Sequence, residues 1–397
     1  MNRDKDRLIM GQFNDSFVPI MDGVGLVARN YARWLNESYG TCYAVVPNVP
    51  GYEDSEPFPV LRFLSLPIPG KDPWRLGIPR LDASFKKKLY GIPFDLIHTH
   101  CPFTSAEVAL DLARERNIPL VTTFHSKYRE DFEKAFRSDM AVSWAMNRIL
   151  RFYHSADFVW VPNKGTMTTL REYGYTGEIE VMINGTDLTA PSSEEYRRYR
   201  TAGQNRIGLT DEDFMFLFVG QHRWIKNIRL ILEAADILKR EKRPFKLVFV
   251  GSGQDEVEIR GLVKKSGLDE QVKFMGRVID REEMKEYYGR ADLFLFPSLY
   301  DTASLVMREA AAFSTPSVLI RGSSTAEDVE DGVNGFLSDN DPASFSRVLK
   351  GLMDNPVRIR KAGEGALESI YFPWEKVVAS VYSRYREIVN TFFRLTT

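Results

Sequence analysis

Short apolar runs alternate along the chain with longer stretches in which apolar residues recur every three or four positions. The short runs are typical of buried parallel strands, and the longer stretches are typical of helices. Repeated alternation of the two predicts an α/β protein with doubly wound parallel sheets. The expected strands are Leu8–Phe13, Cys42–Val46, Asp95–His98, Pro119–Phe124, Phe158–Val161, Phe214–Val219, Phe245–Val250, Val272–Met275, Leu293–Phe296 and Ser317–Ile320, and the expected helices include Val24–Leu35, Ser105–Arg116 and Ile228–Lys239.

The alternation stops between residues 184 and 213, where we find no sustained strand pattern. We therefore expect one Rossmann-like domain over residues 1–190, a linker over 191–212 and a second Rossmann-like domain over 213–373. Ligands of such domains bind beyond the C-terminal ends of the strands. Two of them joined by one linker could face each other across a single central cleft.

The overall charge and the cysteines exclude several classes of protein. A formal net charge of -1 gives no field that would attract nucleic acid. Cys42 and Cys101 form no CxxC pair, which predicts neither a disulfide framework nor a zinc cluster and suits a reducing compartment. The first residues lack the apolar core of a signal peptide, and no apolar run approaches about 20 residues. We expect a cytoplasmic protein.

A glycine-rich segment, Asp22 to Ala28, opens the first expected helix and matches G-x-G-x-x-A. In one interpretation it is a helix-capping turn. In the other, the loop at Gly23 and Gly25 borders the ligand and offers backbone N–H groups to an anion. A dinucleotide site would have its first glycine directly after the strand, and here residues 14–21 intervene. An NAD-dependent enzyme is therefore a weaker alternative.

The second domain carries the residue types that bind a diphosphate. Gly220 ends its first strand, and Lys226 follows in the next turn. Asp301 stands where an N-cap residue is expected, and a helix N-terminus favours phosphate oxygens. Glu309 lies further along that helix. The plain alternatives are a surface lysine, a simple helix cap and an exposed helical glutamate. The backbone N–H groups that would point at the anion are those of Ala303, Ser304 and Leu305.

Taken together, these motifs resemble glycosyltransferase family 4, whose members are retaining enzymes of GT-B fold. The family's Glu-x7-Glu motif aligns with Asp301 and Glu309, and its Gly-Arg-Leu-x-x-Glu-Lys-Asn motif aligns with Gly220 to Asn227. The segment Thr123 to Ser126 resembles that of the family's diacylglycerol glucosyltransferases. Further matching segments lie at residues 95–100, 184–187, 291–298 and 331–336, so the resemblance runs nearly end to end.

The resemblance implies a role for each aligned residue. Glu309 would bind the ribose of a nucleotide-sugar donor, favoured as UDP-hexose, and Asp301 would hold hydroxyls of the transferred sugar. Lys226 would neutralise the pyrophosphate. His125 would lie near the reacting centre. The remaining implications are that the turn at Arg277 and Val278 meets the base, that the loop at Gly23 and Gly25 closes on the phosphates, and that helix 374–397 completes the first domain.

Three departures from the family pattern concern the donor. The family arginine is Gln221 here, and Arg223 is a candidate replacement. The first glutamate of the motif is Asp301, and the usual Gly-Phe-Gly is Thr302-Ala303-Ser304. Stabilisation of the leaving diphosphate by Lys226, Arg223 and the helix amides would do much of the catalysis. We expect no resident cofactor and no metal, because these groups take the metal's place.

Other readings stay open. His98, His100 and His125 could bind a metal, although polar packing is the better interpretation. The acceptor could be a saccharide or a lipid, since basic and aromatic residues alternate between Lys71 and Tyr90 and could lie on an anionic membrane at its inner face. A solvated rim is the alternative. A catalytically silent nucleotide-sugar-binding protein of the same fold is the main rival function.

Overall fold

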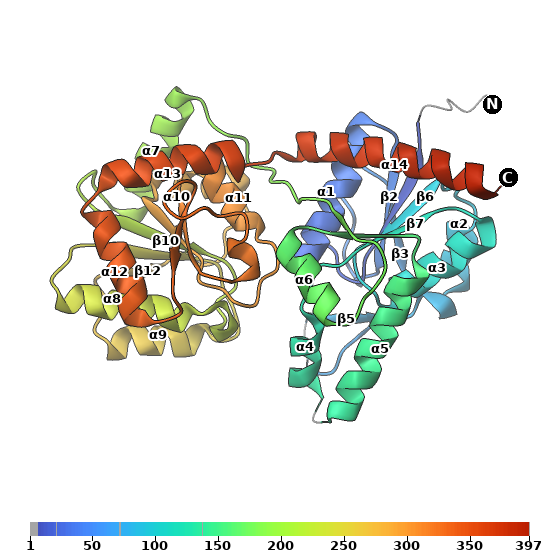
Figure 1. Ribbon diagram of the computed structural model, residues 1–397, viewed down its shortest axis with the longest axis horizontal. Coiled ribbons are helices and arrows are strands. Elements are labelled where there is room, and N and C mark those ends of the chain that lie inside the picture. The colour runs from blue at the N-terminus through green and yellow to red at the C-terminus, as the bar shows by residue number, and fades with distance from the viewer. Residues whose placement is uncertain (1–6, 21, 71–72, 137, 397) are drawn as a thin grey trace. The chain divides into compact units, whose positions relative to one another are not determined.

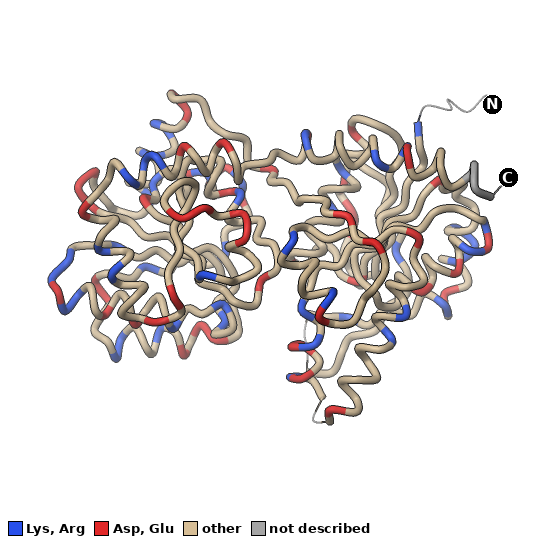
Figure 2. The backbone as a smooth tube through the Cα atoms, in the orientation of Figure 1, with Lys and Arg blue, Asp and Glu red and all other residues tan. Residues whose placement is uncertain are grey.

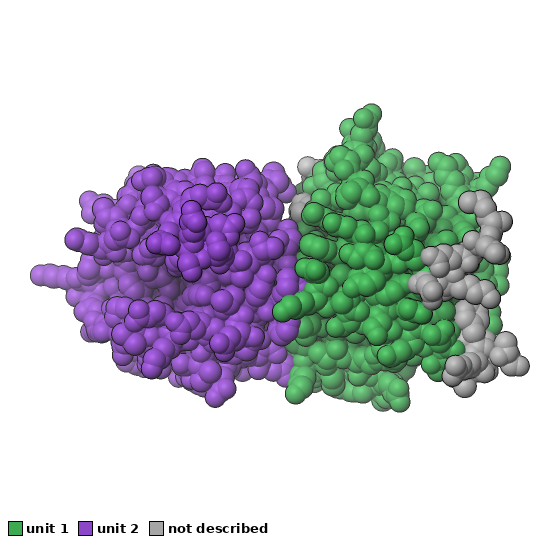
Figure 3. All heavy atoms as spheres, turned by 90° about the horizontal axis from the view of Figure 1, so that it is seen from above, with its two compact units in different colours: residues 1–184, 374–397 green, residues 185–373 purple. Residues whose placement is uncertain are grey.

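The computed structural model describes residues 7–20, 22–70, 73–136 and 138–396. The chain divides into two compact units, coloured separately in Figure 3. Unit 1 consists of residues 1–184 and 374–397, and unit 2 consists of residues 185–373. Each unit is built around its own sheet with helices on both faces (Figure 1).

The sheet of unit 1 has seven strands in the order β3-β2-β1-β6-β7-β8-β9, and every pairing in it is parallel. A separate antiparallel hairpin, β4–β5, leaves the sheet after β3. The strands are β1 Ile9–Phe13, β2 Thr41–Pro47, β3 Val60–Phe63, β4 Ser65–Pro67, β5 Arg75–Gly77, β6 Leu96–Thr99, β7 Leu120–Thr123, β8 Phe158–Val161 and β9 Glu180–Val181.

The helices of unit 1 cover this sheet, and the long C-terminal helix packs against α1. They are α1 Gly23–Ser38, the 3-10 turn η1 Pro79–Leu81, α2 Ala83–Leu89, α3 Thr104–Arg116, α4 Tyr128–Ala135, α5 Asp139–Ser155, α6 Lys164–Glu172 and α14 Trp374–Thr396. Since α14 returns to the first sheet, it shares its buried side with residues more than 300 positions earlier.

The sheet of unit 2 has six parallel strands in the order β12-β11-β10-β13-β14-β15. The strands are β10 Met215–Val219, β11 Lys246–Val250, β12 Val272–Phe274, β13 Leu293–Leu295, β14 Ser317–Ile320 and β15 Phe336–Ser338. The helices are α7 Ser193–Ile207, η2 Trp224–Lys226, α8 Ile228–Arg240, α9 Glu256–Lys265, α10 Arg281–Arg290, α11 Leu305–Ala312, η3 Ser324–Ala326, α12 Pro342–Met353 and α13 Pro356–Ser369.

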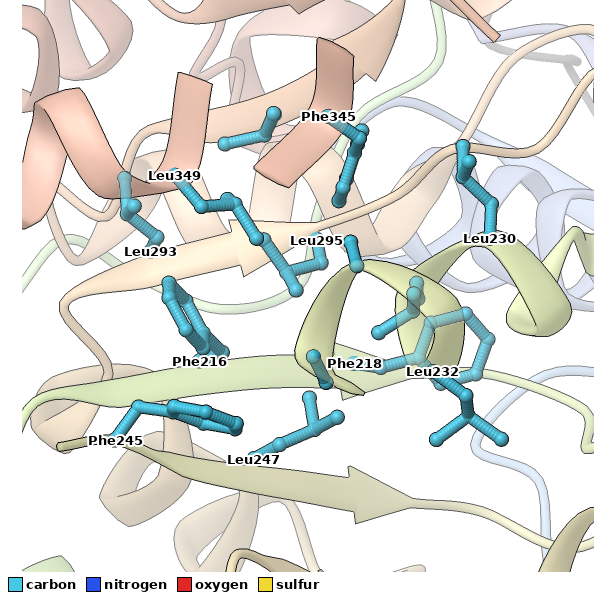
Figure 4. Close-up of a cluster of buried hydrophobic side chains, with 14 of the residues drawn as sticks. Phe216, Phe218, Leu230, Leu232, Phe245, Leu247, Leu293, Leu295, Phe345 and Leu349 are labelled. Atoms are coloured by element: carbon cyan, nitrogen blue, oxygen red, sulfur yellow. The ribbon is translucent and has the colours of Figure 1, made fainter. Parts of the chain in front are cut away.

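Strand alternation divides the core of unit 2 between the two faces of its sheet. Phe216 and Phe218 point toward the face covered by α8 and α12, where Figure 4 shows them packed with Leu232 and Leu349. Leu217, between them in sequence, lies in the cluster on the opposite face with residues of α7, α10 and α11. A strand buried on both faces needs apolar residues at every position, which explains the continuous run Met215–Val219.

The structure confirms the two parallel α/β sheets and every strand expected from the sequence. It differs at the segment expected to be a linker, 191–212. Most of that segment is helix α7, which packs against α10 within unit 2. A capping box between Ser192 and Glu195 begins the helix, and Gly208 in the left-handed conformation ends it.

Charged residues of both signs are interspersed along the tube in each unit (Figure 2). Within the described residues, no helix is both long enough and apolar enough to cross a bilayer.

Candidate functional site

Each sheet has one place where the strand order reverses beside its first strand. In unit 1, β1 lies between β2 and β6, and in unit 2, β10 lies between β11 and β13. The crevice beyond the carboxyl ends at such a reversal is where doubly wound sheets bind ligands. The residues expected to act follow strands at or next to these two points: Gly220 follows β10, Asp301 follows β13 and His125 follows β7.

Three strand-end loops of unit 2 lie in direct contact at this edge. Gly220 N–H donates to the carbonyl of Val250, and Gly251 N–H donates to that of Gly276. A Cβ added to Gly251 would stand 2.0 Å from the carbonyl oxygen of Gly220, and the φ of Gly251 is +137°. Only glycine fits here, so the Gly-Ser-Gly after β11 is needed for close backbone approach.

Lys226 ends the 3-10 turn after β10 and pairs with Asp301 after β13. Its Nζ lies 2.5 Å from Asp301 Oδ1 and 5.5 Å from the centre of the Tyr300 ring. Asn227 Nδ2 holds the turn in place by donating to the carbonyl of Pro297 at 3.1 Å. The other carboxylate oxygen, Asp301 Oδ2, is buried without a hydrogen-bond partner among the described residues. Because buried polar atoms normally have a hydrogen-bond partner, a donor group of a ligand could bind to this oxygen.

The helix after Asp301 begins later than the sequence suggested. Helix α11 starts at Leu305, so Ser304 is its N-cap residue and Asp301 lies outside the helix. Ser304 makes no side-chain hydrogen bond to the first turn. Serine is as good an N-cap residue as aspartate, and the pairing of Asp301 with Lys226 replaces the expected cap. The amide N–H groups at the start of α11 are therefore not capped by the side chain of Ser304.

Glu309 lies on the second turn of α11 and is buried, with 5 % of its side chain exposed. Its Oε1 accepts from Arg281 Nη2 at 2.7 Å, and its Oε2 accepts from the Tyr288 hydroxyl at 2.7 Å. Arg281 also pairs with Asp187 at 2.5 Å. The plain alternative of an exposed helical glutamate is therefore wrong, because the carboxylate is fixed by two partners.

The charges of this group set its protonation. Burial lowers the pKa of Arg281, but the carboxylates of Glu309 and Asp187 outweigh burial and raise it overall. Burial, followed by the nearby negative charge of Glu309, raises the pKa of Tyr288 well above its usual range. Arg281 therefore stays charged and Tyr288 keeps its proton, so both act as hydrogen-bond donors to Glu309.

The other candidates of unit 2 occupy the surrounding loops. Arg277 is exposed and Val278 is half-buried in the loop between β12 and α10. Gln221 is exposed, whereas Arg223 is half-buried and its Nε has no hydrogen-bond partner among the described residues. The Nε–H of Arg223 is therefore a donor that a ligand could use beside the Lys226 turn. Arg223 stays the candidate replacement for the family arginine, whose position is occupied by Gln221.

The glycine loop of unit 1 is part of helix α1. Asp22 is the N-cap, and its Oδ1 accepts from Gly25 N–H at 2.5 Å. Burial raises the pKa of Asp22, although this hydrogen bond acts in the opposite direction. A Cβ built on Gly23 would meet nothing within 4 Å, whereas one on Gly25 would meet Asp22 and Ser16. Gly25 therefore takes part in the helix cap, as the first interpretation has it. Gly23 has free space around it and is the part of the loop that a ligand could approach.

His125 belongs to a buried cluster with His98 and His100. Its Nε2 lies 3.2 Å from His100 Nδ1, and burial lowers its pKa to about 3. The imidazole is therefore neutral at physiological pH. No group of three or more histidine, cysteine, aspartate or glutamate side chains in the described ranges is arranged to hold a metal ion.

Sequence reasoning gave no role to several residues that the fold brings to these sites. Arg281 and Tyr288 hold Glu309, Asp187 holds Arg281, and Gln12 and Tyr385 hold the histidines. Asp187 belongs to a segment that resembles the family, which was the available signal. The others join positions separated by up to 287 residues, and no sequence spacing indicates such contacts.

Two family models match the chain. The model described as "Glycosyltransferase Family 4" matches residues 21–190, and the model described as "Glycosyl transferases group 1" matches residues 200–368. An alpha-monoglucosyldiacylglycerol synthase of Streptococcus pneumoniae is 25 % identical over 353 residues, which cover 87 % of this chain and 79 % of that protein. D-inositol 3-phosphate glycosyltransferase 2 of Catenulispora acidiphila is 29 % identical, covering 78 % and 74 %.

Solved structures show the same fold. The sucrose-phosphate synthase of Thermosynechococcus elongatus superposes with a TM-score of 0.79 at 20 % identity, covering 97 % of this chain and 100 % of that one. Anabaena HepE in complex with UDP and glucose gives a TM-score of 0.74 at 18 % identity, covering 95 % and 99 %. With both family models matched in sequence order and two parallel sheets of this kind, the chain belongs to glycosyltransferase family 4 and has the GT-B fold.

Proposed function

We propose that the protein transfers a hexose, with retention of configuration, from UDP-hexose to a lipid or saccharide acceptor. One observation carries the proposal. Helix α11 carries the buried carboxylate of Glu309 on its second turn, its N-cap residue Ser304 makes no capping hydrogen bond, and Lys226 pairs with Asp301 just before it. This arrangement suits a ligand that is anionic at its diphosphate and carries hydroxyls at its ribose.

The diphosphate would rest against the first turn of α11. The backbone N–H groups of Ala303 and Ser304 just before the helix, that of Leu305 at its start and the helix dipole would provide partial positive charge there, and Lys226 and Arg223 would provide full charges. As the glycosidic bond breaks, negative charge grows on the leaving nucleotide. Groups that are already oriented toward this charge stabilise the transition state more than the ground state.

Glu309 is suited to bind the ribose hydroxyls. Arg281 and Tyr288 each use one site on its two oxygens, and an ionised carboxylate can accept about four hydrogen bonds. The remaining sites can accept from the two ribose hydroxyls. Its two protein partners fix the carboxylate before the donor arrives, which reduces the ordering cost of binding. The backbone around Arg277 and Val278 would meet the base.

We assign hydroxyls of the transferred sugar to Asp301. Asp301 Oδ2, which has no partner among the described residues, would accept from sugar hydroxyls. Lys226 is shared between Asp301 and the incoming diphosphate, so donor binding would loosen their ion pair and release Asp301 toward the sugar. In unit 1, the open loop at Gly23 would approach the donor phosphates, and His125 would accept from a hydroxyl of the sugar or acceptor.

The choice of UDP-hexose draws on the relatives. HepE was solved with UDP and glucose, and two relatives are named as glucosyldiacylglycerol synthases. A thermal-shift panel of UDP-, GDP- and ADP-sugars, with NAD as a fourth ligand, tests the choice. We expect UDP-hexoses to raise the melting temperature and NAD to leave it unchanged. A larger shift with another nucleotide would contradict the proposed donor.

The rival function is a nucleotide-sugar-binding protein without catalysis. Release of UDP from UDP-hexose, measured with and without added acceptors, separates the two. We expect turnover in the natural chain and loss of turnover in Glu309→Gln, since the amide both weakens ribose binding and clashes with the Arg281 donor. A chain that binds UDP-hexose but releases no UDP with any acceptor would favour the rival.

A lipid acceptor is favoured by one feature of unit 1. The antiparallel hairpin β4–β5 pairs Leu66 with Leu76, and both are 51 % exposed. Leu81, at the end of η1, is 79 % exposed, and Lys86, Lys87 and Lys88 are exposed at the end of α2. Exposed leucines flanked by lysines suit the interface of an anionic membrane.

Cosedimentation with vesicles tests the lipid contact. Replacing Lys86, Lys87 and Lys88 by glutamate should abolish sedimentation with anionic phosphatidylglycerol vesicles and leave binding of UDP unchanged. The matched control replaces Lys264 and Lys265, exposed on α9 of unit 2, in the same way. Equal sedimentation of all three proteins would remove the membrane contact from the proposal.

A further inference from the structure

Three buried imidazoles share one hydrogen-bond network at the ends of β1, β6 and β7. His100 Nε2 lies 2.8 Å from Gln12 Oε1, and His100 Nδ1 lies 3.2 Å from His125 Nε2. His98 Nδ1 lies 2.5 Å from the Tyr385 hydroxyl, and His98 Nε2 lies 2.7 Å from Thr123 Oγ1. His98 and His100 are fully buried and His125 is 7 % exposed. The network thus reaches from the centre of the sheet to the candidate site residue.

The amide of Gln12 gives the network a direction. Its Nε2 faces Cys42 Sγ at 3.6 Å and the Tyr385 oxygen at 3.5 Å, so its Oε1 is the atom that accepts from His100. His100 then carries its proton on Nε2, and its Nδ1 has only a lone pair. That lone pair can accept only if His125 carries its proton on Nε2.

All three rings are neutral, which makes the direction consistent. Burial lowers the pKa of His98, His100 and His125, and their mutual repulsion lowers those of His98 and His100 further. A neutral imidazole has one N–H donor and one acceptor. The bond to Gln12 therefore fixes one tautomer of His100, and the bond between His100 and His125 then requires a proton on His125 Nε2.

We propose that Gln12 and His100 are positioning residues that hold His125 as the Nε2–H tautomer, so that a substrate hydroxyl meeting His125 donates its hydrogen bond to Nδ1. The contact between His125 and a substrate hydroxyl rests on the proposed function, whereas the tautomer of His125 does not. His125 then accepts a hydrogen bond from the hydroxyl and so orients it. His125 does not give its own proton to the substrate. It keeps this role across the pH range in which the ring is neutral.

The amide of Gln12 also sets the direction of a second series of hydrogen bonds, through Tyr385 and His98, and this series provides an internal control. Gln12 Nε2 donates to the Tyr385 oxygen, Tyr385 donates to His98 Nδ1, and His98 Nε2–H donates to Thr123. His98 is as buried as His100 and lies on β6, whereas His100 follows directly after that strand. The series runs through His100, so replacing His98 disturbs the packing of the cluster but removes no member of Gln12–His100–His125.

Nitrogen-15 NMR of the full-length chain tests the relay directly, because protonated and unprotonated ring nitrogens have well-separated shifts. His125 is assigned by the loss of its signals in His125→Phe. We expect the proton of His125 on Nε2 in the natural chain without substrate. A proton on Nδ1 would overturn the proposal, since it requires the opposite orientation of Gln12 and the opposite direction of every bond in the series.

Two variants of His100 then link the tautomer to turnover. His100→Asn keeps an acceptor close to the position of Nδ1, and His100→Leu removes it. We expect His100→Leu to mix the tautomers of His125 and lower kcat about tenfold, the value of one lost hydrogen bond to a reacting group, with KM for the donor little changed. His100→Asn should restore the tautomer and most of kcat, and His98→Leu should leave the tautomer unchanged.

The outcomes separate this inference from the proposed function. Equal tautomer ratios and equal kcat in His100→Leu and the natural chain would overturn the positioning role. If the natural chain has the expected tautomer but His125→Phe retains full turnover, the relay stands and the placement of substrate at His125 fails. That second failure belongs to the proposed function.

Discussion

The two sheets put ionisable side chains at the same place, the reversal of strand order, but treat their charge in opposite ways. In unit 2 these groups form ion pairs, the half-buried Lys226 with Asp301 and the half-buried Arg281 with the buried Glu309. In unit 1 the partners of His98 and His100 are hydroxyl, amide and imidazole groups, and burial makes the rings neutral. A charge survives burial only where an opposite charge compensates its desolvation.

The difference indicates what each region can bind. A network of ion pairs can exchange one partner for an anionic ligand, as Lys226 would for a diphosphate. A network of neutral donors and acceptors suits uncharged hydroxyls, because a buried charged ligand there would have no compensating partner. The charge pattern thus supports the proposal that the nucleotide binds to unit 2 and that unit 1 meets hydroxyls of the sugar or acceptor.

The largest expected effect comes from removing the charge of unit 2 that would meet the diphosphate. Lys226→Met should lower kcat for UDP release about 10²- to 10³-fold, the usual cost of deleting one group that stabilises a developing anion. Steady-state kinetics of UDP release measure it. Lys264→Met, which removes an exposed lysine of α9, is the control and should have natural kinetics. If kcat of Lys226→Met falls by less than threefold, the contrast between a charged site in unit 2 and a neutral site in unit 1 is contradicted.

A smaller effect is expected from the hydroxyl that fixes Glu309. Tyr288→Phe removes the donor to Glu309 Oε2 and should weaken UDP binding about tenfold, within the range for a hydrogen bond to a charged group. Isothermal titration calorimetry measures the Kd. The neighbouring Tyr287→Phe removes a hydroxyl that donates to Glu283 instead and should leave the Kd unchanged. Equal Kd values in both variants would show that Glu309 needs no such support.

The neutral cluster of unit 1 predicts acid sensitivity. Histidine in an unfolded chain has a pKa of about 6.5, and the folded values are lower, so only the unfolded state gains protons as the pH falls below about 6.5. Stability is complete above that pH. Below it, each buried histidine removes about 1.4 kcal/mol per pH unit until the pH reaches its folded pKa, which is about 3 for His125.

Urea unfolding followed by tryptophan fluorescence measures this effect in unit 1. Five of the six tryptophans lie in unit 1, and Trp224→Phe removes the sixth. In that background, His98→Asn should reduce the slope of stability against pH by about 1.4 kcal/mol per pH unit. The control His154→Asn, at an exposed histidine, should leave the slope unchanged. Identical slopes in all three proteins would contradict a neutral buried cluster.

The fold was largely predictable because a parallel strand buried on both faces has a continuous apolar run, as Met215–Val219 does. The short edge strands were not predictable, since Glu180–Val181 has two residues and little apolar character. Helix α7 was missed because its sequence is strongly polar, although Ser192 and Glu195 form a recognisable capping box. Local signals of helix ends can therefore reveal helices that apolar spacing does not.

The site was predictable residue by residue but not as a network. The spacing of Asp301 and Glu309 indicated a pair of carboxylates, yet α11 begins only at Leu305, after a bend at Thr302 and Ala303. The contacts of Glu309 with Arg281 and Tyr288 depend on how α10 packs beside α11. Such contacts arise from the packing of whole elements, which no single motif encodes.

A crystal structure of the chain with bound UDP tests the central claim most directly. We predict that the diphosphate lies within hydrogen-bond distance of Lys226 Nζ and the amides of residues 303–305, that Glu309 accepts from the ribose, and that the bond from Lys226 to Asp301 is lengthened. Phosphates bound elsewhere in unit 2 or in unit 1, with Lys226 still paired only to Asp301, would contradict the account.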